Sequence, residues 1–262
     1  MEKTIDKNLK YVFVPGCTVP AYNPELVEKV YAHLKETLGD NVTAMLRCCG
    51  KVTKMVGEKD KFEKRNAIAI NEIDKLGADV IITICPSCYM TFTQTTDTPV
   101  IAYWDLMKEL IGFPEELKGK GKESSVVFNI HDSCATREIS SHQENVRWIL
   151  DQLGYKHEEM HNVKGNTRCC GVGGMVCTTR PDLYKRLYER RAADCTQDSV
   201  ISYCGSCRGT LEAAGKDSLH ILDLMFGPVY TESTFENRAY KSEEEMWANR
   251  LKTKEIFINF EK

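Results

Sequence analysis

Ten of the twelve cysteines in this 262-residue chain form two copies of one pattern, and no other feature constrains the fold as strongly. Each copy has a single cysteine, a Cys-Cys-Gly triplet after 30 to 34 intervening residues, and a Cys-x-x-Cys pair 33 to 35 residues beyond the double cysteine. Matching positions lie 117 to 121 residues apart, so the chain is an internal duplication. The first set is Cys17, Cys48, Cys49, Cys85 and Cys88; the second is Cys134, Cys169, Cys170, Cys204 and Cys207.

Composition and charge describe an ordinary globular protein and exclude several classes of partner. Apolar residues make up 42% of the chain and charged residues 28%, which is normal for a domain with a buried core. The formal net charge of −3 gives no basis for binding nucleic acid. Residues 1–7 are too charged for a signal peptide, and apolar runs such as residues 80–85 are too short to cross a bilayer. We therefore expect a cytoplasmic protein without a transmembrane segment.

That setting decides how the cysteines are interpreted. Dense cysteine forms disulfide scaffolds in small secreted chains, whereas clustered thiols in cytoplasmic proteins bind metals or do redox chemistry. Adjacent cysteines, as at 48–49 and 169–170, rarely pair with each other because the resulting ring is strained. The sequence favours metal or redox chemistry over a disulfide framework.

The repetition extends to the predicted secondary structure. Short β-branched and aromatic runs at 12–14 and 126–130 precede the first cysteine of each set, and runs at 80–84 and 200–203 lead into each Cys-x-x-Cys. Amphipathic helices are expected between these strands. Alternation of strands and helices predicts an α/β fold with two tandem pseudo-symmetric repeats, each a small, mostly parallel sheet flanked by helices.

We place the first repeat at residues 1–119, the second at 120–227, and a charged C-terminal tail at 228–262. Residues 118–125 form a polar, glycine-bearing bridge between the repeats. The tail is expected to contain a helix near 242–251, which either packs back on the body or docks a partner subunit.

All five cysteines of each half are expected where strands end and helices begin, at the edge where parallel α/β sheets bind ligands. Thiolates suit zinc, copper(I) and iron–sulfur clusters. Zinc and a cubane cluster need four ligands, so five thiols are one too many for either. A multi-iron centre matches the larger donor set better.

These motifs resemble the CCG, or cysteine-rich, domain family, which occurs twice in the B subunit of heterodisulfide reductase and in related subunits of lactate, glycolate and quinone-linked oxidation systems. The resemblance covers residues 10–227, and this chain keeps all ten cysteines. It implies two non-cubane 4Fe–4S clusters, each bound by one set of five cysteines; cubane 4Fe–4S or zinc in one half is the alternative. It also implies that a small disulfide is reduced between the clusters, each taking one sulfur.

The chain contains no ferredoxin-type cysteine run and no flavin or nicotinamide motif. The electrons are therefore expected from a partner, an iron–sulfur or flavoprotein subunit, in an anaerobic cytoplasm. Two other functions remain open: an electron-relay subunit that makes and breaks no bond, and an interaction module stabilised by zinc. Neither the disulfide nor the partner is identified by the sequence.

Several residues beside the cysteines are candidates for the same sites. Arg47 and Arg168 precede the double cysteines and would compensate thiolate charge, or are surface arginines repeated by ancestry. Gly50 and Gly171 follow them and would let the backbone approach a cofactor. His131 would donate a proton to a leaving thiolate, or make a structural hydrogen bond at the end of its strand.

Three further signals compete with the metal sites. Residues 157–161 spell HExxH, but this motif binds zinc only on a helix, and the repeat predicts a strand here. Cys177 and Cys195 have no counterpart in the other half. We expect Cys195 to be a core thiol and Cys177 not to be a ligand, because each set of five is complete without them.

Overall fold

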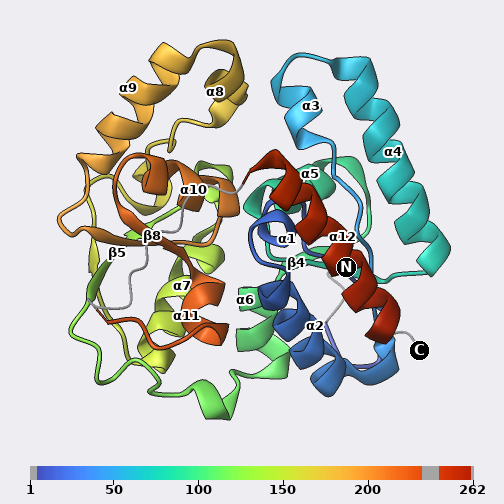
Figure 1. The fold of residues 1–262 in the computed structure, drawn as a ribbon. Coiled ribbons are helices and arrows are strands. Elements are labelled where there is room, and N and C mark those ends of the chain that lie inside the picture. The colour runs from blue at the N-terminus through green and yellow to red at the C-terminus, as the bar shows by residue number, and fades with distance from the viewer. Residues whose placement is uncertain (1–4, 232–241, 261–262) are drawn as a thin grey trace. The chain divides into compact units, whose positions relative to one another are not determined.

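A computed structural model describes residues 5–231 and 242–260 of the chain (Figure 1). The described residues fall into two compact units, one within Met1–Gly112 and Lys241–Lys262 and the other within Phe113–Tyr240. Each unit contains one sheet and one set of five cysteines.

The first unit is built on a four-stranded, all-parallel sheet in the order β2-β1-β3-β4. The strands are short and almost wholly buried, as expected for a sheet covered by helices. The strands are β1 (Tyr11–Val14), β2 (Val42–Ala44), β3 (Val80–Thr83) and β4 (Val100–Ala102). The helices are α1 (Thr18–Tyr22), α2 (Pro24–Leu38), α3 (Lys51–Met55), α4 (Lys59–Leu76), α5 (Pro86–Thr95), α6 (Tyr103–Leu106) and α12 (Glu243–Phe260).

The second unit repeats this plan with a four-stranded, all-parallel sheet in the order β6-β5-β7-β8. The predicted α/β fold, with two parallel sheets flanked by helices, is confirmed. The strands are β5 (Val127–His131), β6 (Lys156–Glu159), β7 (Ser199–Ser202) and β8 (Asp217–His220). The helices are α7 (Ser140–Leu153), α8 (Val176–Thr179), α9 (Pro181–Ala192), α10 (Gly205–Ala213) and α11 (Ile221–Phe226).

Helix α2 shows how local sequence sets these elements. The Asn23 side chain accepts a hydrogen bond from the Glu25 backbone N–H (3.0 Å), and Pro24 occupies the first turn. Gly39, at φ +59°, ends the helix. The apolar face lies against β1, where the Tyr31 and Phe13 rings stack with centroids 6.0 Å apart.

The C-terminal helix α12 completes the core of the first unit. The Phe257 ring meets Phe13 and Tyr31 at centroid distances of 6.2 and 5.1 Å. The Asn249 side chain donates a hydrogen bond to the carbonyl of Ala21 (2.9 Å). The helix expected near 242–251 is confirmed and extends further; residues 232–241 of the proposed tail lie outside the described residues. The described part of the tail therefore packs back on the first unit.

The polar segment 118–125 is bonded to the second unit rather than extended. The backbone N–H groups of Gly119 and Gly121 donate to the carbonyls of Gln152 and Leu153 at the end of α7. The Lys120 ammonium donates to three carbonyls at the end of α11, of Leu224, Met225 and Gly227. These contacts satisfy backbone acceptors that two helix ends would otherwise leave without partners.

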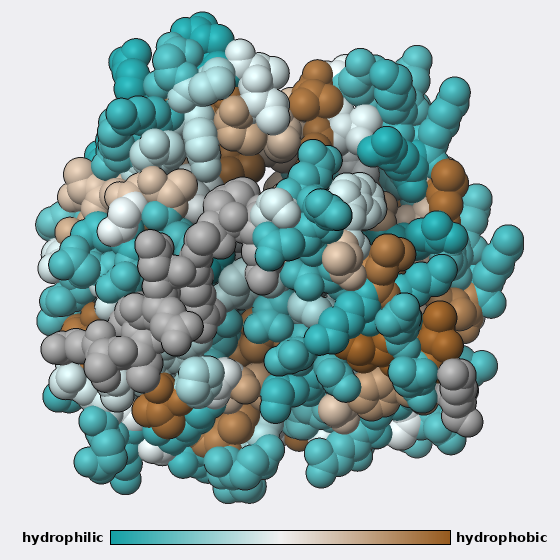
Figure 2. All heavy atoms as spheres, in the orientation of Figure 1, coloured by the Kyte–Doolittle hydropathy of each residue, from teal (hydrophilic) through white to brown (hydrophobic). Residues whose placement is uncertain are grey.

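Hydrophilic side chains predominate on the face shown in Figure 2, in keeping with the charged fraction of the sequence. Among the helices that the structure describes, none combines the length and the apolar character needed to span a membrane.

His220 makes the stability of the second unit depend on pH. Burial lowers the pKa of this imidazole from 6.5 to about 4. As the pH falls below 6.5 the unfolded chain binds a proton that the folded chain refuses, so stability declines until about pH 4. The loss is about 3 kcal/mol at one unit of pKa per 1.36 kcal/mol.

The variant His220→Asn is expected to flatten this slope in anaerobic urea unfolding between pH 7 and 4. Asparagine is a good match because His220 caps α11, where its ring accepts from the Leu222 N–H (3.3 Å), and asparagine is a favoured cap. Equal slopes in the two proteins would show that His220 is already charged in the folded chain.

Candidate functional site

The five cysteines of the first repeat converge at the carboxyl edge of its sheet. Cys17 follows β1 and precedes α1, and the Cys48-Cys49 pair lies in the loop between β2 and α3. Cys85 caps α5 after β3, and Cys88 lies in the first turn of that helix. Three parallel strands thus deliver all five thiols to one edge, as the sequence predicts.

Neighbouring sulfurs shift one another's pKa values within the first repeat. Cys48 accepts from the thiols of Cys17 and Cys49, which, with smaller contributions from the Gly50 N–H and Arg65, lowers the pKa of Cys48 to about 2. Donation to Cys48 raises the pKa of Cys49 to about 12. Cys88 donates to Cys49 and Cys85, which raises its own pKa. The pKa of Cys48 is thus lowered chiefly by its cysteine neighbours.

The second repeat reproduces this arrangement residue by residue. Cys169 accepts from Cys134 and Cys170, which lowers its pKa far below the usual range. Donation to Cys169 raises the pKa of Cys170 to about 12. The thiol of Cys207 donates to Cys204, which lowers the pKa of Cys204 to about 7. Two sequences with different side chains between the cysteines thus build the same cluster of five sulfurs.

Glycines bring the backbone close to both clusters. The N–H groups of Gly50 and Gly171 point at the sulfurs of Cys48 and Cys169, each at 3.4 Å. Both glycines have positive φ, +83° and +118°, which other residues rarely adopt. A Cβ on Gly16, also at positive φ, would lie 3.0 Å from the Cys85 Cβ. A side chain at Gly16 would crowd the sulfurs of Cys85 and Cys88, whereas side chains at Gly50 and Gly171 would meet Phe62 and Leu187.

The donor set fits a multi-iron centre. Five neighbouring sulfurs cannot all ionise unaided, because each thiolate raises the pKa of the next. A bound cationic centre removes that limit, because metal ligands bind as thiolates. The sulfurs also exceed the four that zinc or a cubane cluster takes.

The arginines before the double cysteines pair with carboxylates in the structure. Arg47 donates to Glu72 (2.5 Å), and Arg168 donates to Asp194 (2.8 Å). The guanidinium that lowers the pKa of Cys48 belongs to Arg65 on α4, which the sequence did not single out. Arg65 could have been noticed in the sequence because it lies on the predicted helix that follows the first double cysteine.

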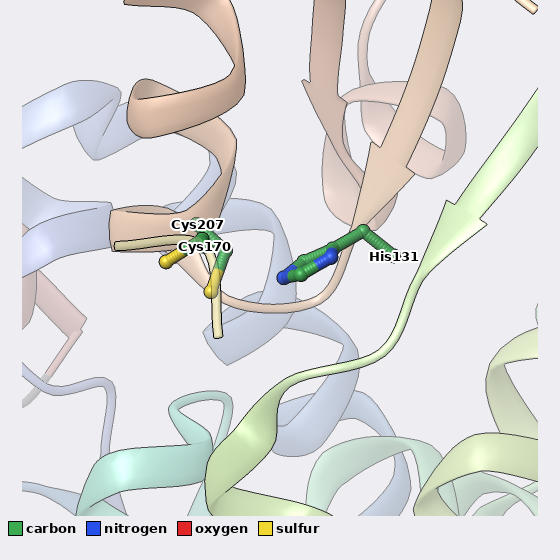
Figure 3. Close-up of side chains that lie close together, drawn as sticks. All are labelled: His131, Cys170 and Cys207. Atoms are coloured by element: carbon green, nitrogen blue, oxygen red, sulfur yellow. The ribbon is translucent and has the colours of Figure 1, made fainter. Parts of the chain in front are cut away.

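His131 lies at the end of β5 and points toward two sulfurs of the second cluster (Figure 3). One atom from each of His131, Cys170 and Cys207 lies within 4.8 Å of the others. The imidazole is fully buried and its Nδ1 accepts a hydrogen bond from Arg191 (2.9 Å). Burial and the neighbouring guanidinium lower the pKa of His131 to about 3.

A buried network of charged side chains supports this site, and sequence reasoning missed it. Arg147 on α7 makes two hydrogen bonds to the Asp132 carboxylate, of 3.0 and 2.9 Å, and further bonds to Glu159. Asp132 also accepts from the Tyr203 hydroxyl and the Lys164 backbone N–H. The network ties the turn before Cys134 to three neighbouring elements.

The remaining signals lie apart from the sulfur clusters. The HExxH sequence begins in β6 rather than a helix, and the ring of His157 pairs with Asp151 (2.9 Å), so the motif has no zinc-binding geometry. Cys177 lies in α8. Cys195, expected in the core, is partly exposed because it lies beyond the end of α9.

Comparison with known proteins supports one family. The model of the cysteine-rich domain CCG matches residues 11–93 and 128–212, one match in each repeat. The D subunit of a dihydromethanophenazine:CoB–CoM heterodisulfide reductase from Methanosarcina mazei is 26% identical over 83% of this chain and 56% of its own length. The B subunit of a CoM/CoB fumarate reductase from Methanothermobacter marburgensis is 25% identical over 81% of this chain and 44% of its own length.

A third relative comes from a different type of electron-transfer system. The EtfAB:quinone oxidoreductase of Syntrophomonas wolfei is 21% identical over 68% of this chain and 27% of its own length. The chain spans about half the length, or less, of these relatives.

Proposed function

This chain belongs to the cysteine-rich CCG domain family, with two copies of the domain, and from that premise we propose that it is an iron–sulfur oxidoreductase subunit that reduces a small disulfide. Each repeat holds one non-cubane 4Fe–4S cluster on its five cysteines. A partner iron–sulfur protein or flavoprotein donates the electrons. We expect an anaerobic cytoplasmic setting, because exposed clusters of this kind would be inactivated by oxygen.

The observation that carries the proposal is the convergence of five thiols, rather than four, in each repeat. A zinc-stabilised module needs four ligands and no redox partner, so a fifth thiol in both halves serves no purpose there. Reduction of a disulfide takes two electrons and two protons and yields two thiols. When bound, two clusters supply the one-electron chemistry that such a reaction divides between them.

The residues of the chain have defined roles in this proposal. The ten cysteines ligate, and the N–H groups of Gly50 and Gly171 stabilise the sulfurs of Cys48 and Cys169. Arg65 adds positive charge beside Cys48. Arg47 and Arg168, paired with carboxylates, shape the loops that present the double cysteines. His131 points toward the sulfurs of the second site, where it would donate a proton to a leaving thiolate or a hydrogen bond to sulfur.

Anaerobically purified or reconstituted chain is expected to contain about eight iron and eight acid-labile sulfide atoms, four of each for every cluster. The measurement is chemical analysis of iron, sulfide and zinc in one sample. Zinc alone in both repeats would contradict the proposal. Four irons with one zinc would support a single redox site and exclude the two-cluster reaction.

A second candidate is an electron-relay subunit that passes charge without breaking a bond. The similarity to the EtfAB:quinone oxidoreductase favours it, because that protein is named as an oxidoreductase that uses a quinone. Turnover of small disulfides by the iron-loaded chain with a reduced ferredoxin-type donor would support the reductase. Reversible one-electron signals without turnover of any disulfide would support the relay.

A further inference from the structure

The two sulfur clusters differ in what lies behind them. Val14 ends β1 and His131 ends β5, and each lies three residues before the first cysteine of its set. Val14 packs in an apolar cluster with Ile73, Cys49 and Cys88. In the second repeat the same position carries a polar ring. This position thus differs between two sites that share the same five cysteines.

The tautomer of His131 is fixed by its partner. The Nε–H of Arg191 points at Nδ1, with a donor–acceptor distance of 2.9 Å. A guanidinium is only a donor, so Nδ1 must be the acceptor and carry no proton. The ring is therefore neutral, with its proton on Nε2.

Arg191 is itself held rigidly. The side chain is fully buried and donates to the carbonyls of His161 and Asn162 and to the carboxylate of Asp194, at 2.8 to 3.0 Å. Asn162 adopts φ +56°, a left-handed conformation that asparagine tolerates better than most residues, and its carbonyl accepts from Arg191. The backbone is shaped to hold Arg191 in place, and Arg191 is a positioning residue for His131.

The proton on Nε2 faces the sulfurs. Nε2 is buried, and it neither donates nor accepts a hydrogen bond within the part of the chain that the structure describes. Figure 3 shows the outer end of the ring directed at Cys170 and Cys207. A histidine beside two thiols resembles a mixed metal site, but a nitrogen that carries a proton cannot be a ligand. His131 is a donor toward sulfur.

We propose that His131, oriented by Arg191, donates an N–H hydrogen bond to the sulfur of the centre bound in the second repeat and gives that centre a higher reduction potential than the first. The inference rests on the proposed function. Hydrogen bonds to sulfur raise iron–sulfur potentials because they stabilise the added negative charge. The two repeats therefore form an ordered pair in which an electron resides preferentially on the second.

The test is an EPR-monitored potentiometric titration of the iron-loaded full chain. The variant His131→Val places at this position the valine found in the first repeat. At a fixed potential, the ratio of reduced to oxidised second centre should fall roughly tenfold in this variant. That ratio corresponds to about 59 mV for a one-electron couple. The first centre is the internal control and should not move; its signal is the one lost in Cys49→Ser. His131→Gln keeps an amide N–H and should restore most of the difference.

Equal midpoints for the two centres in the parent chain, or an unchanged second midpoint in His131→Val, would overturn this inference and leave the proposed function intact. Failure of the parent chain to bind iron would overturn the proposed function and this inference with it. The tautomer gives a readout free of activity: ¹⁵N NMR of the histidine-labelled parent chain should show Nε2 protonated and Nδ1 not. An Nδ1–H tautomer or an imidazolium would overturn the inference even if His131→Val does not fold.

Discussion

Replacing Cys49 by serine is expected to remove about half of the iron and lower disulfide reduction roughly 100-fold or more. Loss of groups that only support metal ligands already lowers activity or affinity 10- to 100-fold, so loss of a ligand is at least as severe. Cys170→Ser, the matched change in the second repeat, should have the same effect, because the reaction needs an electron from each site. The readouts are iron content and turnover with a reduced donor.

The combination of Cys49→Ser and Cys170→Ser tests whether the sites act together. If one lost centre already abolishes turnover, the double variant should be no slower than either single variant, while its iron content approaches zero. Cys177→Ser is the control, since this cysteine belongs to neither set of five. Full turnover in Cys49→Ser, or a loss of iron in Cys177→Ser, would contradict the assignment of ligands.

Replacing Arg147 by leucine is expected to destabilise the chain by about 3–5 kcal/mol, the range found when one partner of a buried ion pair is removed. Arg147 and Asp132 have side chains only 8% and 0% exposed, so the Asp132 carboxylate would lose its main counter-charge away from water. Chemical unfolding under anaerobic conditions measures the change.

Arg180→Leu is the matched control for this prediction. It breaks the pair of Arg180 with Asp182, whose side chains are 65% and 62% exposed. Because solvent screens such pairs, no measurable change in unfolding midpoint is expected. Arg147→Lys keeps the charge without the paired hydrogen bonds and should recover part of the stability. Equal midpoints for Arg147→Leu and Arg180→Leu would show that the buried network contributes little.

The fold was predictable because its signals are local and repeated. Pro24 and Gly39 mark the two ends of α2, and short β-branched runs lead into the cysteines. Convergence of the thiols followed from one rule, that loops after parallel strands meet at one edge. Comparison of the two repeats also excluded the zinc-binding interpretation of HExxH. The repeat predicts a strand at His157, whereas HExxH binds zinc only on a helix.

Contacts between distant residues could not be predicted in the same way. Arg147 and Arg191 look like exposed helix residues until tertiary structure brings Asp132 and His131 beside them. The reverse holds for Arg47, whose place beside the double cysteine suggests a partner sulfur, although the structure pairs it with Glu72 on α4. Side-chain partners depend on packing between elements, and neither spacing nor composition encodes that packing directly.

The helix that closes the first unit comes last in the sequence. The guanidinium of Arg250 on α12 donates to the carbonyl of Cys17 (3.2 Å), and Phe257 seals the core beneath it. During synthesis on a ribosome, the residues of the second repeat emerge before α12. The first repeat therefore cannot complete its core until α12 has been made. Insertion of metal during biosynthesis should accordingly begin at the later repeat, and a chain halted before residue 243 should mature at one site only.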